Sequence, residues 1–143
     1  MSETYANVDA SGDPDAAVAW QERMTAWPAV VAYKARSYEV LGAARRVVDI
    51  GCGPGIDVVA MGARAFGVEP SAAMAETATR RGAVVCRGDA HALPIATSSL
   101  DAARADRVFQ HLFAPETALA EMARVEKRLR RKGGLREGLI ERQ

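Results

Sequence analysis

Residues 47–55 read Val47-Val48-Asp49-Ile50-Gly51-Cys52-Gly53-Pro54-Gly55, an apolar run that ends with an acid and continues with glycine at every second position. The apolar part predicts a buried parallel strand, and the glycines predict the tight turn that leads the chain off its carboxyl end. Glycine has no Cβ, so the turn can adopt positive φ and a ligand can lie directly against its backbone. In open α/β sheets ligands bind at this place. The segment therefore predicts both an α/β fold and a nucleotide-like cofactor.

The spacing of the glycines distinguishes between cofactor classes. The nicotinamide fingerprint Gly-x-Gly-x-x-Gly needs a glycine where this chain has Ile56, and phosphate-binding loops need Gly-Lys-Ser or Gly-Lys-Thr, which the sequence lacks. Asp49 would repel a pyrophosphate and suits a ligand with cationic groups. With its acid and proline included, the run from Asp49 to Gly55 resembles the first motif of class I S-adenosylmethionine-dependent methyltransferases.

Three further segments keep the order of motifs in that family. Glu69 follows Asp49 by 20 residues, the distance at which an acid accepts hydrogen bonds from a ribose diol in related folds. The similar segments are Glu69-Pro70-Ser71-Ala72-Ala73-Met74, which enters the next helix, Gly88-Asp89-Ala90-His91-Ala92-Leu93-Pro94, which contacts adenine in the family, and residues 100–112, the fourth strand and the loop after it. Four motifs in order over residues 45–125 are more specific than one glycine loop.

The resemblance implies the fold and the binding of the cofactor's methionine part. The fold is α/β, a Rossmann-like open parallel sheet with helices on both faces. Gly51, Gly53 and Gly55 would admit the methionine part closely, and Asp49 would be oriented towards its ammonium group.

The resemblance also implies the remaining contacts to S-adenosylmethionine. Glu69 would hold the ribose, and Asp89 with Ala90 the adenine. Ala105 and Asp106 would border the methionine part and the exit of the methyl group. The implied cofactor-binding set is Asp49, Gly51, Cys52, Gly53, Gly55, Glu69, Pro70, Ser71, Met74, Asp89, Ala90, Ala105 and Asp106.

Two residues after the fourth strand are candidates to touch a methyl acceptor. The resemblance implies in-line transfer of an already activated sulfonium methyl, so that the protein mainly positions the acceptor. Arg107 and His111 are the candidate catalytic residues, with His111 as a possible general base. The closest likeness is to quinone and natural-product methyltransferases, which implies a small-molecule acceptor.

Some of these residues have structural interpretations as well. Asp49 could cap backbone amides at a strand end, and Glu69 could be a solvated surface acid. Met74 could belong to the core. Cys52 has no His or Asn placed to activate it, so we expect it to fill space below the turn. His91 lies 20 residues from the second histidine without further ligands at zinc spacing, so no metal site is expected.

Composition indicates one domain with one core. The chain has 143 residues, of which 49% are hydrophobic, and a formal net charge of +1, which argues against a nucleic-acid-coating surface. Cys52 and Cys86 are expected to be free thiols of a reducing compartment. No apolar stretch approaches the roughly 18 residues of a membrane span. We therefore expect a cytoplasmic protein with a small-molecule partner and neither nucleic acid nor membrane.

The N-terminal part is expected to be helical after a flexible start over residues 1–12. Asp13-Pro14 predicts a helix start, Trp27-Pro28 a break and a second start, and Gly42 a stop. Residues 13–42 would thus form a helical lid before the cofactor-binding core of residues 43–125. Side chains that could line an acceptor pocket, or pack the helices on the sheet, are Trp20, Trp27, Tyr33 and Tyr38, and Lys34 or Arg36 could approach the cofactor carboxylate.

The C-terminal part departs from the family. Apolar residues at helical spacing predict a helix over residues 115–132, and residues 126–143 would form its charged end and a tail. The family continues with a Leu-Arg-Pro-Gly-Gly turn and a fifth strand, whereas this tail is too charged for a buried strand. We therefore expect a chain truncated after the fourth strand, with about four strands and an incomplete sheet. Alternatively an oligomer or partner covers the open edge of strand four, or the fold is marginal.

Three functions stay open on these grounds. The first is methyl transfer from S-adenosylmethionine to a small molecule. The second is a cofactor-binding but inactive remnant, or a subunit whose sheet a partner completes. The third is an NAD-dependent oxidoreductase, which Ile56 and Asp49 disfavour. Basic residues outnumber acidic ones from Arg124 onward, and a solvated helix end is favoured there over a nucleic-acid site.

Overall fold

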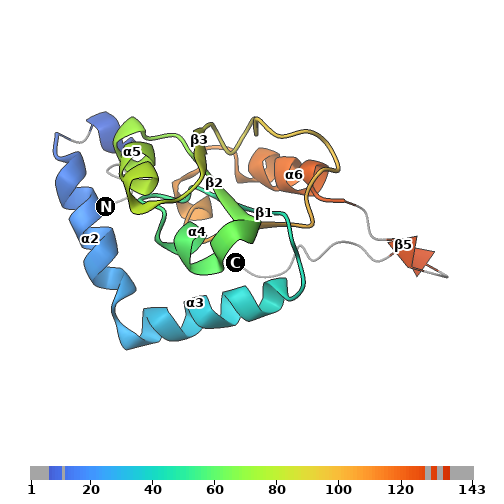
Figure 1. The fold of residues 1–143 in the computed structure, drawn as a ribbon. Helices are drawn as coiled ribbons and strands as arrows, with labels where there is room; N and C mark the ends of the chain where they lie inside the picture. Colours follow the sequence, from blue (N-terminus) through green and yellow to red (C-terminus); the bar gives the residue numbers. More distant parts are fainter. Residues whose placement is uncertain (1–6, 11, 128–129, 132–133, 136–143) are drawn as a thin grey trace.

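The centre of the protein is a parallel sheet of four strands in the order β3-β2-β1-β4. Figure 1 shows the computed structural model, with β1, β2 and β3 labelled. The structure describes residues 7–10, 12–127, 130–131 and 134–135. The strands are β1 (Val47–Ile50), β2 (Ala65–Glu69), β3 (Val85–Arg87) and β4 (Ala102–Ala105). The Rossmann-like sheet predicted from the glycine motif is confirmed.

Helices cover both faces of this sheet, as predicted. The helices are α2 (Pro14–Thr25), α3 (Pro28–Leu41), α4 (Ile56–Met61), α5 (Ala72–Arg81) and α6 (Pro115–Val125), with short 3-10 turns η1 (Val8–Ala10), η2 (Gly62–Arg64) and η3 (Phe109–His111). Successive side chains of β1 alternate between the faces. Val48 and Ile50 pack in one apolar cluster with Ala118 of α6, and Val47 packs in another with Val58 of α4.

The two N-terminal helices begin and end where the sequence predicts. Asp13 caps α2 through a bond from the Ala16 N–H at 2.9 Å, and Pro14 and Pro28 occupy first-turn positions. Helix α3 ends at Gly42. In Figure 1 α2 and α3 form the two arms of an L that runs along two sides of the core.

The N-terminus is more ordered than expected in the part that the structure describes. Residues 8–10 form the turn η1, and Val8 is buried in a cluster with Ala17 and Met74. The expectation of a flexible segment over residues 1–12 is therefore wrong for this turn, because burial of Val8 fixes it. Residues 1–6 and 11 lie outside the described residues.

Helix α6 ends at Val125, earlier than the helix predicted over residues 115–132. Glu126 is extended, with φ −74° and ψ 139°. The N–H of Lys127 donates to the carbonyl of Leu100 at 2.8 Å, and this contact with the sheet edge ends the helix. Beyond it, β5 (Arg130–Arg131) and β6 (Gly134–Leu135) form a short antiparallel pair. Residues 136–143 of the predicted tail lie outside the described part.

The outer edge of β4 is partly covered by the segment after α6. Leu100 and Glu126 form a parallel bridge, and the Glu126 carboxylate accepts the Ala103 N–H at 2.9 Å. A side-chain carboxylate thus satisfies a backbone donor that a further strand would otherwise pair. An oligomer or partner at this edge stays a prediction.

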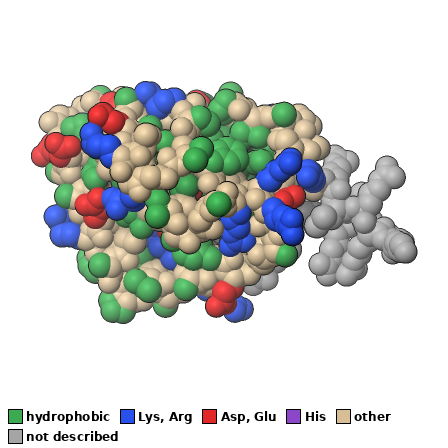
Figure 2. Space-filling view, viewed as in Figure 1, with side chains coloured by type: hydrophobic (Ala, Val, Ile, Leu, Met, Phe, Trp, Pro, Cys, Tyr) green, Lys and Arg blue, Asp and Glu red, His purple; other side chains and the backbone are tan. Residues whose placement is uncertain are grey.

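The surface mixes charge with apolar patches. On the face shown in Figure 2, Lys and Arg side chains are interspersed with Asp and Glu over much of the surface. No helix within the described residues is long and apolar enough to cross a membrane.

Candidate functional site

The glycine turn after β1 is the centre of the candidate site. Gly51, Gly53 and Gly55 have φ of 65°, 54° and 80°, a region that L side chains rarely adopt. A Cβ at Gly51 would lie 2.6 Å from Val108 Cγ2, and one at Gly55 would lie 2.8 Å from Ala78 Cβ. A Cβ at Gly53 would meet no atom within 4 Å. The first and third glycines therefore permit packing of the protein itself, and the middle one leaves room against its backbone.

Cys52 lies below this turn, as expected. It is buried, and a Cβ at Gly67 of β2 would lie 2.3 Å from its Sγ. Burial, with the nearby carboxylates of Asp49 and Glu69, raises the pKa of the thiol. Cys52 is thus a packing residue, and both it and Cys86 are free thiols.

Glu69 links the glycine turn to the start of α5. Its carboxylate accepts the Gly53 N–H at 3.0 Å and the Ser71 N–H at 2.8 Å. Burial raises the pKa of Glu69, against the effect of these two backbone donors. Glu69 is therefore a buried acceptor beside the room left at Gly53, and it is not a solvated surface acid.

The turn into α5 is held from two sides. Ser71 caps α5 by accepting the Met74 N–H at 3.1 Å. Asp9 of η1 accepts the Ser71 hydroxyl at 2.6 Å and the Ala72 N–H at 2.8 Å. Met74 is buried against η1 and α2, which is the core interpretation of this residue. Pro70 is exposed, and its carbonyl accepts Arg87 Nε at 3.1 Å.

The loop after β3 places Asp89 near the carboxyl end of β2. The first residue of this loop, Gly88, is joined to β2, because its N–H donates to the Glu69 carbonyl at 3.3 Å. His91 Nδ1 lies 2.6 Å from Asp89 Oδ1, and His91 Nε2 accepts the Ala114 N–H at 3.3 Å. An Nε2 acceptor assigns the proton of this histidine to Nδ1. Ala90 is buried in the core next to Asp89.

Phe113 covers the His91 ring in a stacked arrangement with 3.9 Å between ring centroids. Because Phe113 and Ala114 follow η3, His91 joins the loop after β3 to the loop after β4. His91 thus connects the predicted adenine segment with the predicted acceptor side, a connection that the sequence does not reveal.

A buried cluster of charged side chains surrounds Asp49 of β1. Arg104 of β4 donates to Asp49 at 2.9 Å and to Asp57 of α4 at 3.1 Å. Lys34 of α3 donates to Asp57 at 2.6 Å, and Tyr38 also hydrogen-bonds Asp57. Burial alone would raise the pKa of Asp57, but the charges of Arg104 and Lys34 outweigh it and hold that pKa below its usual value.

Asp106 extends this cluster to the end of β4. Its carboxylate lies 3.4 Å from Lys34 Nζ and accepts the Tyr33 hydroxyl at 3.1 Å. Arg107, next in the chain, has φ 56° and reaches Met24 Sδ of α2 at 2.8 Å. The two helices of the predicted lid therefore contact the candidate residues directly.

Arg104 and Asp57 are the site residues that sequence reasoning missed. Both are charged residues in otherwise apolar elements, and Arg104 pairs in register with Asp49. The signal available in the sequence was the charged residue within each of these two apolar segments. Arg36, in contrast, pairs with Glu39 on the surface. His111 lies in η3, where its N–H donates to the Val108 carbonyl at 2.9 Å, and its catalytic role stays a prediction.

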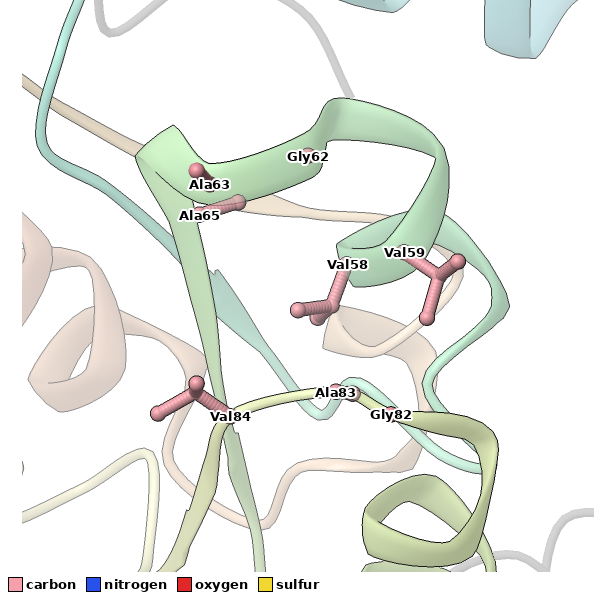
Figure 3. Close-up of a pocket in the computed structure, with 8 residues that line it drawn as sticks. All are labelled: Val58, Val59, Gly62, Ala63, Ala65, Gly82, Ala83 and Val84. Carbon is pink, nitrogen blue, oxygen red and sulfur yellow. The ribbon is translucent and has the colours of Figure 1, made fainter.

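A separate apolar hollow lies at the opposite end of the strands. Its volume is about 240 Å³, and Figure 3 shows its lining side chains. Ala65 begins β2 and Val84 precedes β3, so the hollow opens at the amino ends of these strands. Ligands of open α/β sheets bind at the carboxyl ends, so this hollow is not the candidate site. Within the described residues no three His, Cys, Asp or Glu side chains form a group that could hold a metal.

Known proteins resemble this chain across the same segments. The family described as "Methyltransferase domain" matches residues 48–133. An uncharacterized 37.1 kDa protein in transposon TN4556 of Streptomyces fradiae is 36% identical over an alignment of 138 positions, and this alignment covers 87% of this chain and 40% of that protein.

Two solved structures show the same fold. One is a SAM-dependent methyltransferase, possible histamine N-methyltransferase, of Thermotoga maritima, with 36% identity and a TM-score of 0.61 over 66% of this chain and 45% of that one. The other is the YcgJ protein of Bacillus subtilis, with 26% identity and a TM-score of 0.62 over 66% of this chain and 46% of that one.

The chain spans less than half the length of each of these three relatives. The family match begins in β1, includes the glycine turn and extends through α6, which is more than half of the chain. Together with the SAM-dependent relative, it confirms the cofactor class predicted from the glycine spacing. This protein belongs to the methyltransferase domain family.

Proposed function

We propose that this chain binds S-adenosylmethionine at the carboxyl ends of β1 and β2 and transfers its methyl group to a small-molecule acceptor. The observation that carries the proposal is the room left against Gly53, directly beside the buried carboxylate of Glu69. Backbone without a side chain, next to a buried acceptor, suits a ligand that carries hydroxyl groups.

The chain's own residues would bind and orient the cofactor. Glu69 would accept from the ribose hydroxyls, and Asp89, whose Oδ1 is bonded to His91, would leave Oδ2 for the adenine amino group. Asp49 and Asp106 would lie beside the methionine part. The cofactor supplies an activated sulfonium methyl, so these residues need to position it and exclude water rather than activate it.

The acceptor side is proposed to lie between the loop after β4 and the helical lid. Arg107 and His111 border it, and Tyr33, Trp27 and Trp20 offer partly exposed aromatic surface on α2 and α3. The Thermotoga relative is described as a possible histamine N-methyltransferase, and this supports a small-molecule acceptor here. Two free thiols support a cytoplasmic location.

Calorimetric titration with S-adenosylhomocysteine and with NAD tests the proposal. We expect binding of the first and none of the second, since Ile56 stands where the nicotinamide fingerprint needs glycine. Binding of NAD alone, or of neither compound, would contradict the proposal.

The variant Glu69→Gln tests the role of the ribose acid. We expect binding of S-adenosylhomocysteine to weaken by about 1–3 kcal/mol, because a carboxylate acceptor is lost. Glu76→Gln is the matched control, since Glu76 lies exposed on α5 and pairs with Arg80. Equal affinities of Glu69→Gln and Glu76→Gln would remove Glu69 from the site.

A second candidate function is cofactor binding without turnover, or a subunit that a partner completes. The outer edge of β4 favours the partner-completed subunit, because a side-chain carboxylate, that of Glu126, accepts the Ala103 N–H there. Cofactor consumption in the presence of candidate acceptors separates binding from turnover, and light scattering after size-exclusion chromatography detects a partner copy. A monomer that consumes the cofactor would reject this second candidate.

A further inference from the structure

Arg104 is a buried arginine on a strand that is otherwise made of alanine. It lies on β4 opposite Asp49 of β1 in the parallel register, and its side chain is only 7% exposed. A buried guanidinium costs several kcal/mol of desolvation unless its donors are paired. Here Nε and Nη1 are hydrogen-bonded, and Nη2 lies 3.7 Å from Asp106 Oδ2 as an ion pair. Its partners therefore indicate its role.

The guanidinium is fixed from several sides. Nη1 donates to Asp49 Oδ1 and to Asp57 Oδ2, and Nε donates to Ser37 Oγ at 3.2 Å. The Tyr38 ring centroid lies 5.3 Å from Cζ of Arg104. With these contacts from α3 and α4, Arg104 holds the carboxylate of Asp49 in one orientation.

This arrangement leaves one oxygen of Asp49 available. Oδ1 is bonded to Arg104, and Oδ2 accepts no hydrogen bond from any residue that the structure describes. Asp49 stands two positions before Gly51, next to the turn where the cofactor is proposed to bind. A nearly buried carboxylate oxygen without a donor favours a cationic donor from a ligand.

We propose that Arg104 is a positioning residue of the cofactor site, which keeps Asp49 ionised and oriented so that Oδ2 accepts a hydrogen bond from the ammonium group of the cofactor. The inference rests on the proposed function, because it needs a bound ligand with an ammonium group. Arg104 acts through Asp49 and takes no part in the transfer itself.

The environment of Asp49 explains why a cation on β4 is needed to keep this carboxyl group ionised. Burial raises the pKa of Asp49 to about 7, and the charge of Arg104 is the largest opposing influence. Asp57 also raises this pKa, and Lys34 lowers it slightly. Loss of the charge at position 104 would raise the pKa further and leave Asp49 neutral near pH 7. The groups that face Asp49 are Arg104 from β4, Asp57 from α4, Lys34 and Tyr38 from α3, and Cys52 from the turn.

The experiment measures affinity for S-adenosylhomocysteine by calorimetry near pH 6, 7 and 8. The variants are Arg104→Gln, Arg104→Lys and Asp49→Asn, with Arg80→Gln on the surface of α5 as the control. For a pKa of about 7 the ionised fraction rises about tenfold between pH 6 and 8, so the affinities of the wild type and Arg80→Gln should rise by about that factor.

The charge at position 104 sets the expected differences. Arg104→Lys should keep the wild-type pH profile. Asp49→Asn should bind weakly at all three pH values, with no such rise. Arg104→Gln should match Asp49→Asn near pH 7 and regain affinity only at higher pH.

Identical pH profiles of the wild type and Arg104→Gln would overturn the proposal. Equal losses in Arg104→Gln and Arg104→Lys without a shifted profile would overturn it too, because they indicate a purely structural role. If circular dichroism shows that Arg104→Gln is unfolded, Arg104→Lys decides: a wild-type profile supports the proposal, and the flat profile of Asp49→Asn contradicts it. A wild type that binds at no pH contradicts the proposed function itself and removes this inference with it.

Discussion

At the scale of single residues, the candidate site joins backbone without side chains to carboxylates that are almost fully buried. Gly53 has room against its backbone, and Glu69 and Asp49 are buried on the two sides of the turn. Burial raises the pKa of both carboxyl groups. Ligand binding and protein stability should therefore both depend on pH.

Gly53→Ala should abolish binding of S-adenosylhomocysteine while the protein stays folded. A Cβ there meets no protein atom within 4 Å and would occupy the room proposed for the ligand. The positive φ should cost about 1 kcal/mol of stability. Gly82→Ala is the matched control, because Gly82 has φ 96° and equal space but lies at the end of α5. Calorimetry and thermal unfolding measure both effects, and equal affinities of the two variants would contradict the assignment.

Asp49 should make the protein less stable as pH rises from about 5 to 8. Its pKa is near 4 when unfolded and about 7 when folded, so the folded state binds more protons in this window and loses that advantage as pH rises through 7. The loss is on the order of 2–4 kcal/mol. Denaturant unfolding at several pH values should show a steeper slope in the wild type than in Asp49→Asn, in which the raised pKa of Glu69 still contributes.

Asp101→Asn is the control for this slope. Bonds from the Arg45 and Arg46 N–H groups hold the pKa of Asp101 below its usual value, so Asp101 does not titrate in the window. This variant should shift the stability curve without changing its slope. Equal slopes in the wild type and in Asp49→Asn would assign the effect to another group.

At the scale of elements, the N-terminal turn and the helical lid are tied to the two ends of α5. Asp9 of η1 binds the first turn of α5. At the other end Arg81 hydrogen-bonds Glu22 of α2 and donates to the Pro54 carbonyl of the glycine turn at 2.9 Å. The lid is therefore connected to the site through α5 as well as through α3.

Asp9→Ala should release η1 from α5 and cost about 1 kcal/mol, since a cap of the first turn is lost. Amide hydrogen exchange should become faster at Ala72 and Ala73, whose N–H groups Asp9 accepts. Asp15→Ala, in the exposed first turn of α2, should leave these two amides unchanged. Unchanged exchange in Asp9→Ala would mean that Ser71 alone caps α5.

Local patterns predicted the elements, and long-range contacts explain what they missed. Prolines and glycines at the ends of α2 and α3 affect the backbone within a few residues. The sequence therefore predicts where these two helices begin and end. The end of α6 at Val125 depends on Leu100, and the order of η1 depends on the burial of Val8 against Met74. The Arg104 cluster likewise assembles from β1, β4, α3 and α4, and such assembly is visible only after the strands are in register.

At the scale of the whole molecule, the candidate site lies at the carboxyl ends of the described strands. The outer edge of β4, a different side of the sheet, is partly covered. The glycine turn, Glu69 and the Asp89 loop lie at the carboxyl ends of β1, β2 and β3, whereas the apolar hollow lies at the amino ends. The cofactor is therefore expected to bind at the carboxyl ends, and residues at the hollow serve as the comparison.

The most direct test is an amide chemical-shift map of the protein titrated with S-adenosylhomocysteine. The largest shifts are expected at the N–H groups of Gly53 and Ser71, which donate to Glu69, and at Ala90. Gly62 and Gly82 at the hollow should not move. Shifts centred on the hollow, or no saturable shifts at Gly53 and Ser71, would contradict the central claim that the glycine turn is the cofactor site.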